Sequence, residues 1–110
     1  MTDFIQVVTT TDSQESAKRI ADAAVKDRLA ACAQIVGPIL STYWWEGKVE
    51  EAQEWLVILK SRRDLYAKIE ETVCAVHPYD VPEILAVPVE AGGRGYLEWL
   101  SQELRNPDIQ

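Results

Sequence analysis

The sequence has little of what most catalytic and metal-binding motifs require. Its 110 residues contain one histidine, His77, and two cysteines, Cys32 and Cys74, which stand 42 positions apart. There is no C-x-x-C and no H-x-x-x-H spacing, so a dense metal-binding motif is excluded. No nucleophile stands beside a base in a hydrolase-like pattern. Hydrolase chemistry therefore has no candidate residues, whereas acid–base catalysis by paired charged side chains stays open.

Basic residues and long apolar runs are also scarce. Eleven basic residues against eighteen acidic ones give a net charge of −7, which disfavours nucleic acid and anionic membranes as partners. No apolar run approaches the length of a transmembrane span, and Met1–Phe4 lacks the basic start of a signal peptide. We expect a cytoplasmic protein whose two thiols are reduced.

What is present fits one α+β domain covering residues 1–110. Hydrophobic residues make up 47% and charged residues 26%, as in globular proteins. Periodicity predicts strand, helix, two strands, helix, strand and a final helix, at residues 4–10, 13–29, 29–45, 49–60, 61–76, 84–90 and 96–104. This βαββαβ order with an extra C-terminal helix is that of a ferredoxin-like sandwich, with two helices on one face of an antiparallel sheet.

Local signals predict where these elements begin and turn. Asp12, with Glu15 three residues later, resembles a capping box, and Ser61 is a candidate cap for the second helix. Glu46-Gly47 predicts the turn of a hairpin whose arms are about twice the mean strand length. Gly37-Pro38 predicts a bulge or bend in the first arm.

The middle strands predict self-association. They carry apolar residues on both faces, and Trp44, Trp45 and Trp55 lie in the long hairpin. With helices on only one sheet face, a monomer would expose a large apolar patch. We expect a closed cyclic oligomer in which sheets meet and hairpins reach a neighbour.

The segment His77-Pro78-Tyr79-Asp80-Val81-Pro82-Glu83 is the strongest candidate site. Its two prolines stiffen the chain and hold the polar side chains just before the apolar run 84–87. His77 offers an imidazole and Cys32 or Cys74 a thiolate, ligand types that suit copper or zinc, with carboxylates from Asp80 and Glu83. The alternatives are a rigid connector facing water and, for Cys32, a small core residue.

A second group of polar residues follows the return strand. Glu54, Leu56, Ile58 and Lys60 share one strand face, and Tyr43 and Tyr79 offer hydroxyl donors. Lys60 either extends to water at the strand end or pairs with an anion or carboxylate in a cleft.

Blocks along most of the chain resemble the CutA family of divalent-cation-tolerance proteins. They are Leu29-Ala30-Ala31-Cys32, Ser41-Thr42-Tyr43-Trp44-Trp45-Glu46-Gly47, Glu54 with Leu56 to Lys60, the 77–83 segment, and Tyr96-Leu97-Glu98-Trp99. The resemblance implies a ferredoxin-like homotrimer with a role in tolerance to copper and other divalent ions, without a defined reaction. We therefore expect a protein that is not an enzyme. In members with proposed copper sites, the ligands lie at the position of His77 and at the positions that Val76 and Thr9 or Thr10 occupy here, so this chain lacks the second His and the Cys of that set.

The resemblance also implies a cleft between subunits, lined by Tyr43, Trp45, Glu54, Lys60 and Tyr79 together with His77 and Glu83. The leading hypothesis is a homotrimer that binds a divalent cation, Cu(II) or Zn(II), through His77, Glu83, Asp80 and Cys32. The alternative, by analogy with the similar fold and trimeric clefts of PII proteins, is a small-molecule sensor that uses the cleft. A third hypothesis is a scaffold that presents its acidic surface to a partner protein.

Overall fold

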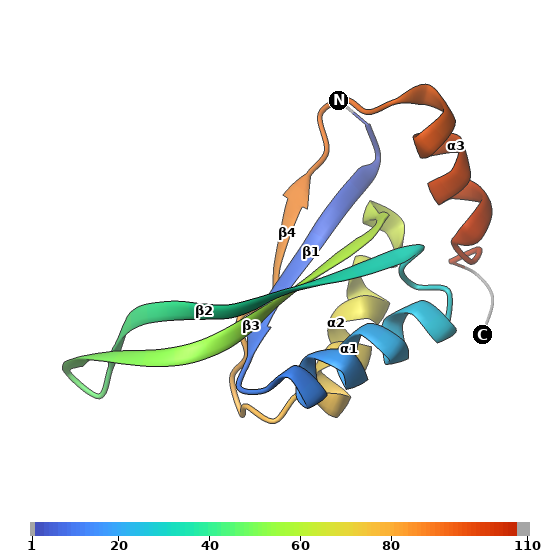
Figure 1. Cartoon of the computed structure of the whole chain (residues 1–110). Helices are drawn as coiled ribbons and strands as arrows, with labels where there is room; N and C mark the ends of the chain where they lie inside the picture. Colours follow the sequence, from blue (N-terminus) through green and yellow to red (C-terminus); the bar gives the residue numbers. More distant parts are fainter. Residues whose placement is uncertain (1, 108–110) are drawn as a thin grey trace.

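A computed structural model describes residues 2–107 of the chain. The elements follow the predicted order, with one short 3-10 turn, η1, before the second helix (Figure 1). Their bounds are β1 Phe4–Thr11, α1 Gln14–Lys26, β2 Cys32–Trp45, β3 Lys48–Arg62, η1 Arg63–Leu65, α2 Tyr66–Val76, β4 Leu85–Pro88 and α3 Arg94–Glu103.

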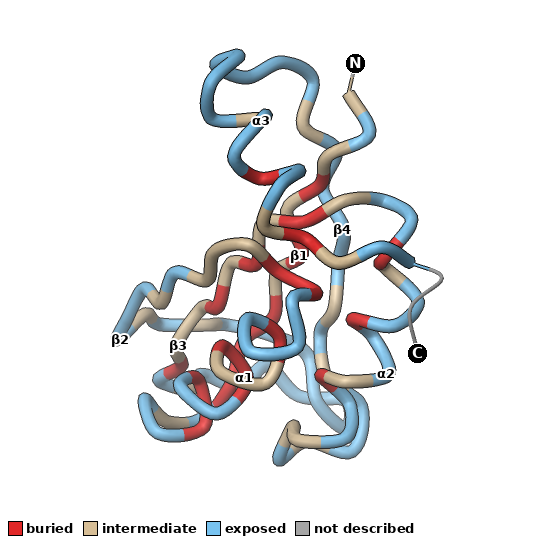
Figure 2. The backbone as a smooth tube through the Cα atoms, turned by 90° about the vertical axis from the view of Figure 1, so that its right-hand side faces the viewer, coloured by how far each residue is buried: buried red, intermediate tan, exposed pale blue. Residues whose placement is uncertain are grey.

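The strands form one antiparallel sheet in the order β2-β3-β1-β4. Helices α1 and α2 pack on one face of this sheet, and the buried core lies between the two layers (Figures 1 and 2). Alternate residues of β1 and β3 and the small face of α1 supply most of that core, including Ile5, Val7, Ala17, Ile20, Ala24, Val57 and Leu59. The ferredoxin-like α+β fold expected from the sequence is confirmed.

The β2-β3 hairpin extends well beyond the helices and gives the molecule extents of 44 × 29 × 22 Å (Figure 1). Its arms contain 14 and 15 residues. Glu46 and Gly47 have φ angles of 50° and 79°, and Trp45 pairs with Lys48. Two positive φ angles are those of a type I′ turn, which matches the twist of antiparallel arms. The predicted hairpin turn is confirmed.

The irregularity predicted at Gly37-Pro38 is also present. The pairing of β2 with β3 shifts between Val36 and Ile39, and the Gly37-Pro38 peptide bond is cis. A Cβ atom at Gly37 would lie 2.3 Å from Cδ1 of Trp55, whose ring packs against the core. Glycine is therefore required by this close approach of the strand to an indole.

Helix α1 differs from the prediction at both ends. Its N-cap is Ser13, whose hydroxyl accepts the Ser16 N–H at 3.0 Å, and not Asp12. The helix ends at Lys26 and not at residue 29, because Arg28 adopts a left-handed φ of 56°. A residue in this conformation commonly ends a helix, and the last carbonyls of the helix then accept hydrogen bonds from backbone N–H groups just beyond it.

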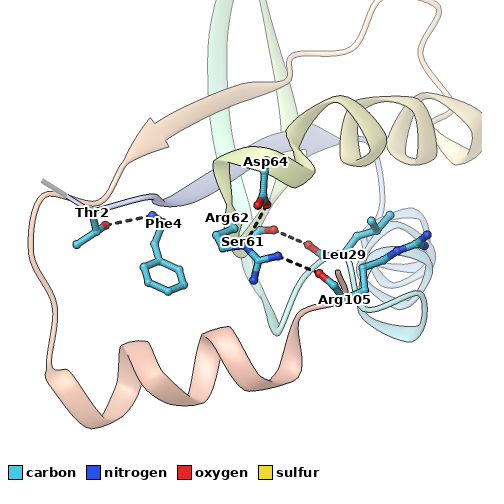
Figure 3. Close-up of polar contacts among 7 residues, drawn as sticks. All are labelled: Thr2, Phe4, Leu29, Ser61, Arg62, Asp64 and Arg105. Carbon is cyan, nitrogen blue, oxygen red and sulfur yellow. Dashed lines mark hydrogen bonds and ion pairs between the residues drawn. The ribbon is translucent and has the colours of Figure 1, made fainter. Parts of the chain in front are cut away.

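Ser61 does not cap the second helix. It is still part of β3, fully buried, and its hydroxyl donates to the carbonyl of Leu29 (Figure 3). Arg62 continues the strand and donates both to Asp64 and to the carbonyl of Arg105. The helix α2 therefore starts five residues later than predicted, after η1. Strand β4 is also shorter than the predicted 84–90 and ends at Pro88.

The sheet face opposite α1 and α2, called the open face here, carries exposed apolar side chains. Val36, Leu85 and Val87 lie on it by strand alternation, and Leu85 pairs with Val8. Helix α3 lies at the end of the sheet, where Tyr96 approaches Lys60. Within residues 2–107, no helix is long and apolar enough to cross a membrane.

Candidate functional site

A cavity of about 750 Å³ lies between the hairpin and the segment 79–83. It is lined by Thr10 of β1, by Ser41, Thr42, Tyr43 and Trp45 of β2, by Glu54 of β3, and by Tyr79, Asp80, Val81 and Glu83. Four of the five cleft residues proposed from the sequence thus come together: Tyr43, Trp45, Glu54 and Tyr79. The volume is in the range of pockets that hold small molecules.

Lys60 is the cleft candidate that the structure separates from this cavity. Six residue-to-residue steps along an extended strand separate Glu54 from Lys60, which places them about 20 Å apart. The Nζ atom of Lys60 lies 5.7 Å from the ring centroid of Tyr96, a cation–π arrangement with α3. Sharing a strand face is therefore not enough to put two side chains into one site.

A hydrogen bond across 25 positions of sequence forms the inner wall of the cavity. The hydroxyl of Tyr79 donates to Oε2 of Glu54 at 2.8 Å, and Glu54 is only 7% exposed. Burial, followed by the hydrogen bond to Glu54 and that carboxylate's charge, raises the pKa of Tyr79 well above its usual value. Tyr79 is consequently a neutral donor at physiological pH.

His77 anchors the segment 77–83 to β1. It follows the last residue of α2, where the extended φ and ψ favoured before Pro78 end the helix. Its Nδ1 accepts the N–H of Tyr79 at 3.1 Å, so the ring proton is on Nε2, which lies 2.9 Å from the carbonyl of Thr10 and 3.2 Å from Oγ1 of Thr9. Both ring nitrogens are engaged within the chain.

The environment of His77 favours its neutral form. Burial lowers the pKa of His77 below its usual 6.5, against the opposing influence of the Thr10 carbonyl and the charges of Asp12 and Glu54. The ring also stands 4.9 Å from that of Tyr79, tilted by 53°. The same side chain thus positions the phenol that contacts Glu54.

The metal-ligand candidates do not form one cluster in the single chain. Asp80 and Glu83 line the cavity, whereas Cys32 pairs with Lys60, about 13 Å along the strands from the level of Thr10 and His77. In the described part of the chain, no three His, Cys, Asp or Glu side chains are grouped so that they could hold a metal ion. The residues present therefore do not make a preformed Cu(II) or Zn(II) site within one subunit.

Some cavity residues were not proposed from the sequence. Ser41 shares a strand face with Tyr43 and Trp45, so alternation could have found it. Thr10, which the sequence suggested only as a metal-ligand position, reaches the cavity because β1 pairs with β3. Val81 reaches it through the path of the 77–83 segment. Neither of these features has a local sequence signal.

The fold and the cavity define an antiparallel α+β domain with a ligand-sized cavity beside a long hairpin. Residues 5–103 match the family model of the CutA1 divalent ion tolerance protein. The chain belongs to this family, as its sequence blocks indicated.

Relatives support this membership over most of the chain. The Thermus thermophilus divalent-cation tolerance protein CutA is 47% identical over 96 residues, which cover 87% of this chain and 93% of that protein. The rice chloroplastic protein CutA 1 is 46% identical over 101 residues, 92% of this chain. This chain spans only 57% of the rice protein's length and 56% of that of the Arabidopsis chloroplastic CutA.

Solved structures of the family have the same fold. The divalent cation tolerance protein from Thermus thermophilus superposes with a TM-score of 0.90 at 44% identity, over 93% of this chain and 99% of that one. The Archaeoglobus fulgidus CutA gives 0.89 at 38% identity, with the same coverage of both chains.

The compartments named for related proteins contradict the expected cytoplasmic location. The rice and Arabidopsis relatives are named chloroplastic, and the Archaeoglobus fulgidus structure is described as that of a periplasmic protein. Members with this fold therefore occur in several compartments. The absence of a basic start at Met1–Phe4 does not decide among them.

Proposed function

We propose that this protein acts in divalent-cation tolerance as a homotrimer and without catalysis. The match to the family of divalent ion tolerance proteins supports the role, and the exposed apolar surface carries the proposal of a homotrimer. Trp44 is 74% exposed, Leu40 69% and Leu85 57%, on the hairpin and on the open face. Soluble monomers seldom expose apolar patches of this kind, and a closed cyclic assembly would bury both surfaces.

The assembly is tested by light scattering or native mass spectrometry of the purified chain. We expect a single species with three times the 12.4 kDa mass of the subunit. A monomer at micromolar concentration would contradict the proposal, and a dimer would contradict the ring of three.

We propose further that a divalent ion of the Cu(II) or Zn(II) type binds through His77 with a carboxylate from Asp80 or Glu83. Two facts support this: the relatives are named for divalent-cation tolerance, and these three side chains stand on one short segment. Because both nitrogens of His77 are engaged, ion binding requires that one of its hydrogen bonds be exchanged. Cys32 is too distant to contribute from the same subunit.

Calorimetric titration of metal-free protein with Cu(II) and Zn(II) tests this site. We expect saturable binding near one ion per subunit in the wild type and a loss of about tenfold or more in affinity in His77→Ala. Cys74→Ser is the matched control, because Cys74 is exposed and its replacement removes the soft ligand that α2 offers. Undiminished binding in His77→Ala would rule out this site.

The cavity supports a second candidate function, a PII-like small-molecule sensor. A space of about 750 Å³ with aromatic walls and a buried carboxylate has the size and composition of a ligand pocket. In a thermal-shift screen, a ligand of this cavity should raise the melting temperature of wild type and of Lys60→Ala, but not of Trp45→Ala. An equal loss in Lys60→Ala would place the ligand elsewhere.

A further inference from the structure

The charges around the cavity are all negative. Glu54, Asp80 and Glu83 line it, and no Lys, Arg or His side chain of residues 2–107 does so. The sequence had suggested a cleft that contains Lys60, which would suit an anionic or zwitterionic ligand. The predicted cleft lay between subunits; within one subunit Lys60 lies against Tyr96, away from the cavity, so the electrostatic field of this cavity attracts cations.

Glu54, the most buried of these carboxylates, has no cationic partner among residues 2–107. None of the ion pairs in the described part of the chain involves Glu54, Asp80 or Glu83. Glu54 is nine-tenths buried, and its partner is the neutral hydroxyl of Tyr79. Because a buried carboxylate is costly without a counter-charge, a cation that enters the cavity would be stabilised at this position.

Aromatic side chains supply the second element of a cation site. Tyr43 and Trp45 line the hairpin side of the cavity, and Tyr79 lines the opposite side. The faces of such rings attract ammonium groups, and their apolar surfaces pack against the attached carbon chain. A carboxylate together with aromatic walls is the combination that recognises organic ammonium ions.

The size of the cavity favours an organic cation over a bare metal ion as its ligand. The carboxylates are distributed around a space of about 750 Å³, and they are not grouped as a metal site would require in the part of the chain that the structure describes. A molecule with several heavy atoms can fill such a space and still reach more than one carboxylate.

We propose that this cavity binds a small organic cation, an aliphatic amine that carries one or more ammonium groups. The assignment rests on the small-molecule role proposed for the same cavity and names its ligand class. An ammonium group pairs with Glu54, the methylene chain packs on Tyr43 and Trp45, and a further ammonium group reaches Asp80 or Glu83 at the rim.

Calorimetric titration with spermidine, at about 0.15 M salt to screen general attraction, tests the assignment. We expect saturable binding to the wild type that is weaker by about tenfold or more in Glu54→Gln, which keeps an acceptor for Tyr79 but removes the charge. Glu70→Gln is the matched control, since it removes one charge from an exposed position of α2, which does not line the cavity. Its affinity should equal that of the wild type.

A second variant protects the test against misfolding of the Glu54 substitution. Asp80→Asn combined with Glu83→Gln changes two residues at the rim and should also weaken spermidine binding. If spermidine bound all variants equally and this binding were lost at higher salt, the binding would be a general attraction to the −7 net charge, and the proposal would be overturned. If citrate, a polycarboxylate, bound the wild type but not Trp45→Ala, while spermidine did not bind, the cationic class of ligand would be wrong and the sensor role would stand. If neither spermidine nor citrate bound, both the organic-cation proposal and the sensor role would be rejected.

Discussion

The single histidine connects three parts of the molecule. Through Nδ1 it holds the backbone of Tyr79, and through Nε2 it reaches the Thr9 and Thr10 end of β1. Tyr79 in turn contacts Glu54 on β3. Because an imidazolium cannot accept a hydrogen bond, protonation of His77 would remove the contact to the Tyr79 N–H.

The free energy of unfolding of the metal-free protein should therefore fall as the pH drops below about 6.5. The pKa of His77 is lowered in the folded chain, so between the two pKa values the unfolded chain binds more protons. Acidification through this window then favours unfolding. Urea midpoints at about pH 7.5 and about pH 5.5, measured with a chelator present, provide the comparison.

His77→Gln is the control for this effect, because it keeps a polar side chain that does not titrate. Its stability should change less than that of the wild type across the same pH interval. Since His77 is the only histidine, its ring nitrogen resonances can be followed without ambiguity. A proton found on Nδ1 at neutral pH would contradict the hydrogen-bond assignment.

At the scale of elements, the hairpin is constrained where β2 passes the indole of Trp55. Gly37→Ala would place a methyl group 2.3 Å from Cδ1 of that ring. Because Trp55 packs on the core, the ring has little freedom to move away. We expect a loss of about 1–3 kcal/mol in the free energy of unfolding, measured by denaturant titration.

Gly95→Ala is the matched control, since a Cβ atom at this position of α3 would meet no neighbouring atom within 4 Å. Alanine in a helix is favoured over glycine, so this variant should be as stable as the wild type or up to about 1 kcal/mol more stable. If both alanine variants behaved alike, the contact with Trp55 would not be what restricts residue 37.

Elements with local signals were predictable from the sequence. Alternation gave the strands, Glu46-Gly47 the hairpin turn and Gly37-Pro38 the bulge. Boundaries that depend on distant partners were not predictable: Ser61 has the chemistry of a helix cap, yet its bond to Leu29 keeps it in β3.

The same distinction applies to the candidate site. Tyr43, Trp45, Glu54 and Tyr79 were named from the sequence, and the structure gathers them around one cavity. The position of Lys60 could not be read from its strand face, because an extended strand separates successive residues by about 3.3 Å. The contact of Tyr79 with Glu54 depends on how the 77–83 segment crosses the sheet, and that path is set by His77.

At the scale of the whole molecule, the two faces of the sheet differ in whether helices already cover them. The open face carries Leu85 and Val87, and the opposite sheet face is already covered by α1 and α2. With a net charge of −7, copies of the chain repel one another at long range, so the proposed association would depend on close apolar contact. A charge placed on the open face should therefore have a much larger effect than one on the helices.

Leu85→Lys should disrupt the proposed trimer, whereas Val25→Lys, an exposed apolar position on α1, should not. An unpaired ammonium group buried between subunits costs about 3 kcal/mol or more, equivalent to a weakening of about a hundredfold or more. Light scattering over a range of concentrations would report dissociation, and circular dichroism would show whether the subunit remains folded. If Leu85→Lys kept the mass of a trimer at low concentration, the open face would lie outside the interface. The hairpin residues Leu40 and Trp44 would then be the surface that holds the subunits together.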